Sequence, residues 1–365
     1  MFFEIEKELL SEGMSKIVSI TERRSPLPIL THALIEVKEK VLSITATDLE
    51  VGIRVNYNCI DGSDGLATIP ARKFMEIVRE LGSGPIRIEL GDRFRLKVTS
   101  GRSSFDLAGM DPSDFPAWSS TEDIQTNEIT SDKLVHMLEK TIFASSNDDS
   151  RFNLNGVLIE KNDKQTRFVA TDGHRLALID EEIDMSIPSK VIVPKKGLME
   201  LKRLLESQKE NVEIGFERKN LILKSSKAMM TIRLIEGDYP DYLRVLPTDT
   251  AITISANKPD LLQCLKRMAI LTSDRNKGVN ICIKNGQMEF SVNHPDLGAA
   301  NDVIEVDYNY ELEIILILNV FYMIDAIGNL DSDKILIEYY KDGAPIKFLN
   351  GPDSNYFSIV MPMRK

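Results

Sequence analysis

The chain has 365 residues, of which 42% are hydrophobic and 28% charged, and its formal net charge at pH 7 is −11. One hydrophobic core rarely organises a chain of this length, so several domains are expected, and the lack of long Pro, Ser or Gly tracts excludes a disordered arm. The negative net charge argues against nucleic acid as a partner, because phosphate binding needs local positive potential. The net charge does not show, however, how the charged residues are distributed.

Neither the cysteines nor the N-terminal segment indicates export. Cys59, Cys264 and Cys282 are an odd number without CxxC spacing, which argues against a disulfide framework and a zinc knuckle and favours a reducing compartment. The segment MFFEIEKELL carries glutamates where a signal peptide needs a basic start and an apolar run. We therefore expect a cytoplasmic protein.

In chain order, the predicted elements form one pattern that occurs three times. Each occurrence opens with an amphipathic helix, whose apolar residues recur at spacings of three and four and so share one buried face. Alternating strands such as ALIEV, VLSITA and GVLIE follow, and then comes a second helix introduced by proline or asparagine. Further strands with turn signals close each occurrence. The opening helices are expected around residues 9–17, 134–142 and 261–268.

The most apolar stretch, Ile314 to Ile324, is about half as long as a transmembrane helix and ends at Asp325. It therefore predicts a buried strand that leads into the second helix of the third occurrence, and no membrane partner.

Short landmarks indicate that these occurrences are copies of one unit of about 120 residues. Three landmarks return at one constant spacing: Ala46–Asp48 as Ala170–Asp172, Ile69–Lys73 as Val193–Gly197, and Asp114–Pro116 as Asp238–Pro240. The third copy is more diverged, but Met323 follows Met199 at the spacing that separates Met199 from Met75.

A unit of two helices and about eight antiparallel strands with short turns places its helices on one face of a sheet layer, so the fold class is α+β. Copies of this size hold their own cores, and we expect three domains at residues 1–121, 122–246 and 247–365. Short polar junctions should keep neighbouring copies in a constant spatial relation, so that successive copies trace an arc. Such an arc either closes into a ring or grows into a filament. If each copy turned the arc by about a sixth of a circle, two chains would close a ring.

Basic residues gather on several of the predicted helices: Arg72, Lys73, Arg79, Lys195, Lys196, Lys202, Arg203, Lys258, Lys266 and Arg267. A basic helical lining would attract a phosphate backbone. Helices also carry such residues on ordinary solvated faces, and charge alone leaves both interpretations open. No helix-turn-helix, zinc finger or stacking platform is evident, so any DNA binding should use the backbone without sequence readout.

An enzymatic interpretation takes Asp172 and His174 as an acid/base pair. The matching positions of the first copy are Asp48 and Glu50, and no Gly-x-Ser-x-Gly elbow occurs, so we expect no catalytic residue.

Metal and cofactor signals are also weak. The histidines lie far apart without ligand spacing: His32, His136, His174 and His294. Asp61–Gly65 lacks the closing glutamate of a calcium loop and predicts a hairpin turn, and Leu81–Pro85 lacks the lysine of a phosphate loop. We expect neither a metal nor a cofactor.

Eight stretches taken together resemble the bacterial β sliding clamp family, the processivity subunits of DNA polymerase III, over essentially the whole chain. They are Ser25–Leu30, Ala46–Glu50, Pro70–Phe74, Ser100–Ser103, Asp114–Pro116, Ala170–Ala177, Pro240–Tyr242 and Val360–Arg364. The resemblance implies a head-to-tail homodimeric ring with helices lining the hole, placed on double-stranded DNA by a clamp loader. It also implies a non-catalytic subunit that tethers the replicative polymerase, other DNA polymerases and repair factors through their clamp-binding peptides.

The family's peptide-binding pocket lies between the second and third copies, and the resemblance assigns its lining here. The residues are Leu154, Thr171, Gly173, His174, Arg175, Leu176, Pro240, Arg244, Val245, Pro345, Ile346, Val360, Met361, Pro362, Met363 and Arg364. Leucine, valine and methionine suit an adaptable apolar groove, and Arg175, Arg244 and Arg364 could hold the polar ends or carboxylates of a peptide.

The resemblance also assigns DNA contacts and a dimer interface. The DNA contacts are Arg24, Arg72, Lys73, Arg151, Lys195, Lys196 and Arg275. The interface residues are Phe105 and Leu107 against Ile270 and Leu271, with Lys73 and Arg102 facing Asp296 and Asp302. Ser104 stands where the family often has a second arginine, and the acidic stretch is thin, so a faster-opening ring is expected.

Overall fold

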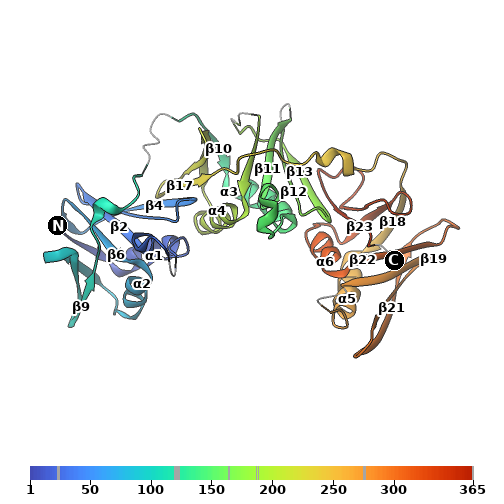
Figure 1. The fold of residues 1–365 in the computed structure, drawn as a ribbon, viewed down its shortest axis with the longest axis horizontal. Coiled ribbons are helices and arrows are strands. Elements are labelled where there is room, and N and C mark those ends of the chain that lie inside the picture. The colour runs from blue at the N-terminus through green and yellow to red at the C-terminus, as the bar shows by residue number, and fades with distance from the viewer. Residues whose placement is uncertain are drawn as a thin grey trace. The chain divides into compact units, whose positions relative to one another are not determined.

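The computed structural model describes residues 1–22, 25–118, 124–162, 165–185, 187, 189–273 and 277–363. Arg24, Arg275 and Arg364, which the resemblance assigns to DNA or peptide contacts, lie outside the described residues. The predicted α+β class is confirmed, with helices set among antiparallel sheets (Figure 1).

The three copies have two helices inserted among short strands in the same order, except that the first copy has one additional short strand, β5. The first copy contains β1 (Phe2–Glu6), α1 (Lys7–Ile17), β2 (His32–Lys38), β3 (Val41–Thr47), β4 (Val51–Asn58), β5 (Asp61–Ser63), β6 (Gly65–Pro70), α2 (Ala71–Glu80), β7 (Pro85–Leu90), β8 (Arg95–Ser100) and β9 (Ser103–Ala108). The second contains β10 (Thr126–Thr130), α3 (Ser131–Thr141), β11 (Gly156–Asn162), β12 (Gln165–Thr171), β13 (Arg175–Glu181), β14 (Lys190–Pro194), α4 (Lys195–Gln208), β15 (Asn211–Glu217), β16 (Asn220–Lys224) and β17 (Ala228–Arg233). The third contains β18 (Ile252–Asn257), α5 (Lys258–Ala269), β19 (Gly278–Lys284), β20 (Gln287–His294), β21 (Gly298–Asp307), β22 (Ile314–Asn319), α6 (Val320–Gly328), β23 (Lys334–Tyr339), β24 (Ile346–Leu349) and β25 (Tyr356–Val360).

The opening helices of the copies are confirmed as α1, α3 and α5. In α1, Leu10, Met14 and Ile17 are fully buried and recur at helical spacing. A Cβ atom at Gly13 would lie 2.7 Å from the Tyr57 ring, so the glycine lets this helix approach the sheet closely.

The second helices, α2, α4 and α6, contain the equally spaced methionines. The apolar stretch of the third copy forms β22 and continues into α6, as predicted. Asn319 caps α6, because its side-chain oxygen accepts a hydrogen bond from the backbone N–H of Phe321 at 3.0 Å. Within the described ranges, no helix is long and apolar enough to cross a membrane.

The hairpin turn predicted at Asp61–Gly65 is wrong in part, because residues 61–63 form strand β5. This strand pairs antiparallel with β1, which lies far from it in sequence, so the turn residues alone did not reveal it.

The chain packs as two compact units. The first comprises Met1–Val135, Met185–Pro188 and Lys196–Leu234, and the second comprises His136–Asp184, Ser189–Lys195 and Ile235–Lys365. The first unit holds a five-stranded sheet, ordered β5-β1-β7-β8-β9, and an eight-stranded sheet, ordered β10-β15-β16-β17-β4-β3-β2-β6. The second holds a twelve-stranded sheet, ordered β14-β11-β12-β13-β25-β24-β23-β18-β21-β20-β19-β22.

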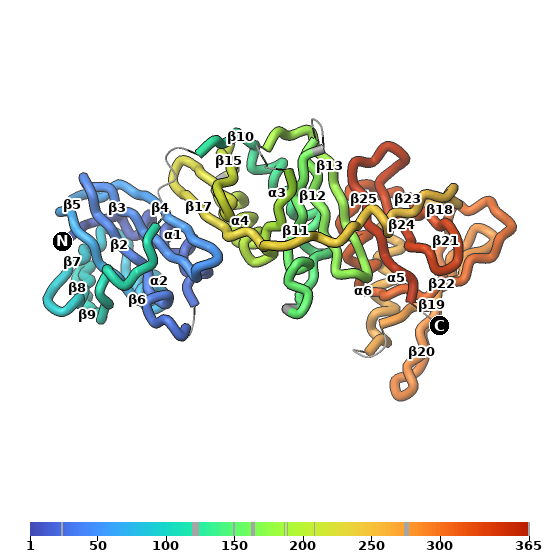
Figure 2. Tube along the Cα trace, turned by 45° about the horizontal axis from the view of Figure 1, so that its top comes forward, coloured from blue at the N-terminus to red at the C-terminus, as the bar shows by residue number. Residues whose placement is uncertain are grey.

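The second copy contributes strands to both units. Its strand β17 pairs with β4 of the first copy (Figure 1), and its strand β13 pairs with β25 of the third copy (Figure 2). Backbone hydrogen bonding therefore continues from one copy to the next within each unit. The three-domain boundaries at 121/122 and 246/247 stay a prediction.

Candidate functional site

A tight loop at residues 171–175 forms the centre of the site assigned to peptides. Asp172 Oδ1 accepts hydrogen bonds from the backbone N–H groups of His174, at 2.9 Å, and Arg175, at 3.0 Å. Gly173 has φ +88°, a conformation that favours glycine. The Gly173 N–H donates to the Thr171 hydroxyl at 3.1 Å, and that hydroxyl donates to the Arg175 carbonyl at 2.5 Å. The loop is therefore held in one shape by its own side chains.

Strand pairing brings residues distant in sequence next to this loop. Arg175 on β13 lies opposite Val360 on β25, and Val360 lies opposite Ile346 on β24. The pairing continues past the end of β25, because Met361 N–H donates to the His174 carbonyl at 2.8 Å. The second and third copies thus place their assigned pocket residues side by side.

An apolar cluster forms the floor of the same region. Its buried members are Leu154, Leu158, Val169, Leu176, Leu178, Ile192, Tyr239, Tyr242 and Ile359. Only Leu154 and Leu176 of these were assigned from the sequence. The Thr171 N–H donates to the Tyr239 hydroxyl at 3.0 Å, and burial raises the pKa of Tyr239 above its usual value. Tyr239 belongs to the Asp-Tyr-Pro landmark that repeats Asp114–Pro116, and this signal could have identified it.

Above this floor, several assigned side chains reach solvent. His174, Pro240, Arg244, Val245 and Met363 are exposed. Thr171, Pro345, Met361 and Pro362 are partly buried, whereas Val360 and Ile346 are fully covered. Exposed apolar side chains over a buried apolar cluster form a surface suited to apolar peptide residues.

Arg175 does not offer its charge to a peptide, contrary to the expectation from sequence. Its guanidinium lies 3.0 Å from the Asp172 carboxylate and 2.5 Å from the Asp325 carboxylate, and the side chain is only 12% exposed. The rings of Phe143 and Tyr322 lie 5.5 and 4.5 Å from its central carbon. Arg175 therefore ties the loop to α6. Arg244 is exposed, and its guanidinium donates to the Asp241 carboxylate at 2.9 Å.

The described residues assigned to DNA differ in how free their charges are. Lys73 is exposed, and its one ion pair within the described part of the chain is with exposed Glu76. Arg72 donates to the Thr21 carbonyl at 2.8 Å and Arg151 to the Asp172 carbonyl at 3.2 Å.

The two lysines that open α4 are engaged in the fold. Lys195 donates to Asn147 at 2.8 Å, and burial, followed by the Arg175 charge, lowers its pKa. Lys196 lies 2.5 Å from the Asp48 carboxylate. Burial acts to lower the pKa of Lys196, but the close negative charge of the Asp48 carboxylate raises it overall.

The residues assigned to the dimer differ in position and exposure. Phe105 and Leu107 are on β9, the last strand of the five-stranded sheet, and Phe105 is exposed. Ile270 follows α5 and is 75% exposed, and Leu271 is partly buried. Arg102 and Asp296 are exposed as well.

Asp302 is not free for a partner chain. Arg267 lies 2.5 Å from its carboxylate. Burial acts to raise the pKa of Asp302, but the hydrogen bond from Arg267 lowers it overall. One of the two acidic interface groups is therefore already paired within its own chain.

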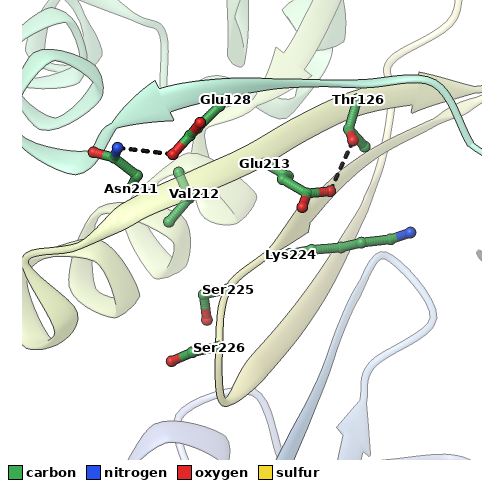
Figure 3. A pocket seen from close by; sticks show the side chains of 8 residues that line it. All are labelled: Thr126, Glu128, Asn211, Val212, Glu213, Lys224, Ser225 and Ser226. Atoms are coloured by element: carbon green, nitrogen blue, oxygen red, sulfur yellow. Dashed lines mark hydrogen bonds between the residues drawn. The ribbon is translucent and has the colours of Figure 1, made fainter.

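The described surface also carries a polar hollow of about 540 Å³ over β10, β15 and β16. Figure 3 shows Thr126 donating to Glu213 and Asn211 donating to Glu128, each at 2.8 Å. No three His, Cys, Asp or Glu side chains among the described residues gather as ligands for a metal. At the loop, both oxygens of Asp172 are bound by backbone and Arg175 groups, so Asp172 is not placed as a base for His174.

Three family models match the chain in succession. They describe the N-terminal domain of the DNA polymerase III beta subunit over residues 1–119, its central domain over 128–241, and its C-terminal domain over 243–364. Among curated proteins, the beta sliding clamp of Proteus mirabilis is 36% identical and that of Escherichia coli 32% identical, each with 100% of both chains covered.

Solved structures give the same result. A DNA polymerase III subunit beta from Pseudomonas aeruginosa has a TM-score of 0.94 at 31% identity, with 100% of both chains covered. A sliding clamp from the same organism bound to griselimycin has a TM-score of 0.92 at 32% identity, again with 100% of both chains covered.

Proposed function

Since the chain belongs to the bacterial β sliding clamp family, the beta subunits of DNA polymerase III, we propose that two copies of it close head to tail into a ring around double-stranded DNA and dock partner peptides beside residues 171–175. Members of this family are processivity factors. The chain is accordingly a non-catalytic subunit that tethers a polymerase to DNA during replication.

The observation that carries the peptide site is the alignment of Arg175, Val360 and Ile346 on three neighbouring strands beside a rigid loop. The buried apolar cluster gives this surface a floor for apolar side chains, and exposed Val245 and Met363 give it an adaptable rim. The occupants are short linear peptides of the replicative polymerase, other DNA polymerases, repair factors and the clamp loader. The clamp from Pseudomonas aeruginosa bound to griselimycin supports a ligand site in the family.

The dimer is supported by sheet edges and exposed apolar residues. Among the described residues, strand β9 has a partner on one side only, and the Gly298–Asn301 part of β21 pairs only with β20. Unpaired strand edges are templates for another chain. Phe105 and Ile270 beside these edges supply apolar surface for a second copy.

DNA binding is supported by basic residues on the helices, among them Lys73, which is exposed on α2. Contacts to phosphate carry no register along the sequence, so the ring would slide on the duplex. Such a role belongs in the cytoplasm, where bacterial DNA is replicated.

Intact-mass measurement together with electron imaging tests the ring. We expect the mass of two chains and a central hole. A monomer at micromolar concentration would contradict the ring while leaving the peptide site open.

Titration of a polymerase C-terminal peptide tests the docking site. We expect deletion of Met361–Lys365 to weaken binding by at least about tenfold, because the deletion removes the strand extension beside His174. The intact mass of the shortened chain is the control for the ring. Unchanged peptide affinity would show that the site lies elsewhere.

A further inference from the structure

A second groove lies in the first unit, where the first and second copies share a sheet. It is a hollow of about 1030 Å³ over strands β2, β3, β4 and β17. Residues 112–118 form one wall, and Leu34, Arg54 and Met229 line the sheet side. Nothing in the proposed function uses this groove.

The pairing of β4 with β17 beside this groove has the same register as the pairing of β13 with β25 beside the peptide site. Gly52 on β4 lies opposite Thr231 on β17, as Leu176 on β13 lies opposite Ile359 on β25. The hydrogen bond that extends the pairing is also repeated. Arg233 N–H donates to the Glu50 carbonyl at 2.8 Å, and Met361 N–H donates to the His174 carbonyl at 2.8 Å.

The side chains over the two junctions correspond as well. The landmark that supplies Tyr239 and Tyr242 to the floor of the peptide site supplies Phe115 and Trp118 here. Phe115 is buried like Tyr239, but Trp118 is only partly buried. A Cβ at Gly52 would lie 2.9 Å from Cζ3 of Trp118, so the absence of a side chain at Gly52 lets the indole pack against the strand.

Each region contains an arginine, and the two guanidinium groups differ in their hydrogen bonds. Near the peptide site, Arg167 donates two hydrogen bonds of 2.8 Å to Asp180 and a third to the Tyr242 hydroxyl, so each of its three nitrogens donates within the fold. In the groove, Arg54 lies 5.3 Å from the Trp118 ring and donates only through Nε, to the Thr45 hydroxyl at 3.0 Å.

The Nη1 and Nη2 groups of Arg54 lack hydrogen-bond acceptors among the described residues. Its Nη2 lies 3.7 Å from the Glu36 carboxylate, beyond hydrogen-bonding distance, and no hydrogen bond from Nη1 or Nη2 occurs among the described residues. The Arg54 side chain is only 24% exposed, and this burial lowers the pKa of its guanidinium. A desolvated guanidinium with free donors is complementary to a carboxylate.

We propose that this groove docks an extended peptide segment of a partner protein, which places an apolar side chain against Trp118 and a carboxylate on Arg54. The comparison with the second junction rests on the proposed peptide site, whereas the Arg54 and Trp118 geometry does not. Lys38 at the edge of the groove adds a second cation for an acidic segment, and Glu36 and Glu39 exclude segments with further acidic residues near them.

Trp118 is the only tryptophan of the chain, so its fluorescence reports this groove and not the peptide site. The probe is the tryptophan-free peptide acetyl-Leu-Thr-Leu-Thr-Glu-amide, whose leucines and glutamate lie on one face when it is extended. Its counterpart ending in glutamine lacks only the charge. We expect saturable change in Trp118 emission with both peptides and affinity about tenfold higher for the glutamate peptide.

Variants separate docking from damage to the fold. We expect Arg54→Gln to abolish the preference for the glutamate peptide, and Arg218→Gln, at an exposed turn, to preserve it. Gly52→Ala should displace the indole and weaken both peptides. Equal affinities of the two peptides for the wild-type chain, or no emission change at millimolar peptide, would overturn the proposal. Either result would leave the polymerase-peptide titration at the other site unaffected, so the two proposals fail separately.

Discussion

Lys196 of the second copy lies 2.5 Å from Oδ2 of Asp48 in the first copy, and the Asp48 side chain is only 1% exposed. The other carboxylate oxygen accepts the backbone N–H groups of Glu50 and Val51 at 3.0 and 2.7 Å. Among the described residues, no aligned hydrogen-bond donor reaches Oδ2, so the lysine charge is its compensation. The resemblance assigns Lys196 to DNA, and the geometry gives it a structural role as well.

Lys196→Ala should therefore destabilise the chain. It leaves a buried carboxylate oxygen without compensation, at a cost of about 1–3 kcal/mol in the free energy of unfolding, and the exposure of Lys196 itself favours the lower end. Urea unfolding measures this loss. Lys73→Ala, which removes an exposed lysine, should change the free energy by less than about 0.5 kcal/mol. Equal effects of both substitutions would refute the role of the Asp48 pair.

Asp325→Asn should weaken peptide docking indirectly, through Arg175 and the loop at 171–175. The substitution removes one of the two carboxylates that hold Arg175, so the loop at 171–175 loses its tie to α6. We expect a loss of about threefold to tenfold in affinity for a polymerase peptide, measured by calorimetry. Asp241→Asn, which frees the exposed Arg244, is the matched control and should have a smaller effect. An unaltered affinity for the Asp325 variant would mean that the loop keeps its shape without Arg175.

Ile270→Asp should open the ring. The side chain is 75% exposed in one chain, and a charge there would be buried against the second copy. We expect the dissociation constant of the dimer to rise by at least about tenfold, measured by analytical ultracentrifugation at low protein concentration. Ile60→Asp, at another exposed isoleucine, should leave the dissociation constant unaltered.

The thin acidic stretch further predicts that the dissociation constant of the dimer depends weakly on salt, since Asp302 already pairs with Arg267.

Lys73→Gln should reduce the salt dependence of DNA binding. Each phosphate contact contributes about 0.9 to the slope of log affinity against log salt concentration, so the slope should fall by about 0.9 for each of the two copies whose Lys73 contacts a phosphate. Intact mass first establishes that the variant remains a two-chain assembly. Lys190→Gln, on strand β14, should keep the wild-type slope. A slope that stays the same for Lys73→Gln would remove this residue from the DNA contacts.

Stability of the second unit should depend on acid pH through Asp331. Burial acts to raise the pKa of Asp331, but hydrogen bonding and charge from Lys140, followed by the charge of His136, lower it overall. The carboxylate therefore stabilises the fold above its unfolded pKa of about 3.9, and this contribution is lost as the pH falls through the lower folded pKa. Lys140 is 5% exposed and lies 2.5 Å from Asp331.

Urea unfolding at a series of pH values tests this dependence. We expect Asp331→Asn to destabilise the chain at pH 7 and to match the wild type once the pH is below the folded pKa. Asp249→Asn, in an exposed pair with Lys341, should follow the wild-type profile. A constant difference between Asp331→Asn and wild type at every pH would show that charge is not the cause.

The sequence by itself determined the elements and their repetition. Helical spacing in α1 and capping by Asn319 in α6 depend on residues within a few positions of each other, so both could be predicted locally. The landmarks around Asp48 and Asp172 also revealed the copies, because the same turn needs the same residues. The resemblance added the assigned pocket, and strand pairing places Arg175, Val360 and Ile346 of that set side by side in the second unit.

Only the tertiary structure decided which strands and charges meet. The pairing of β17 with β4 and of β13 with β25 divides the second copy between two units, and a strand's own residues do not specify such a partner. Arg175 and Arg54 carry the same group, yet the first is enclosed by Asp172 and Asp325, whereas Nη1 and Nη2 of the second make no hydrogen bond to any described residue. The physical reason is that solvation and partner distance fix the role of a charge, and both depend on residues far away in the chain.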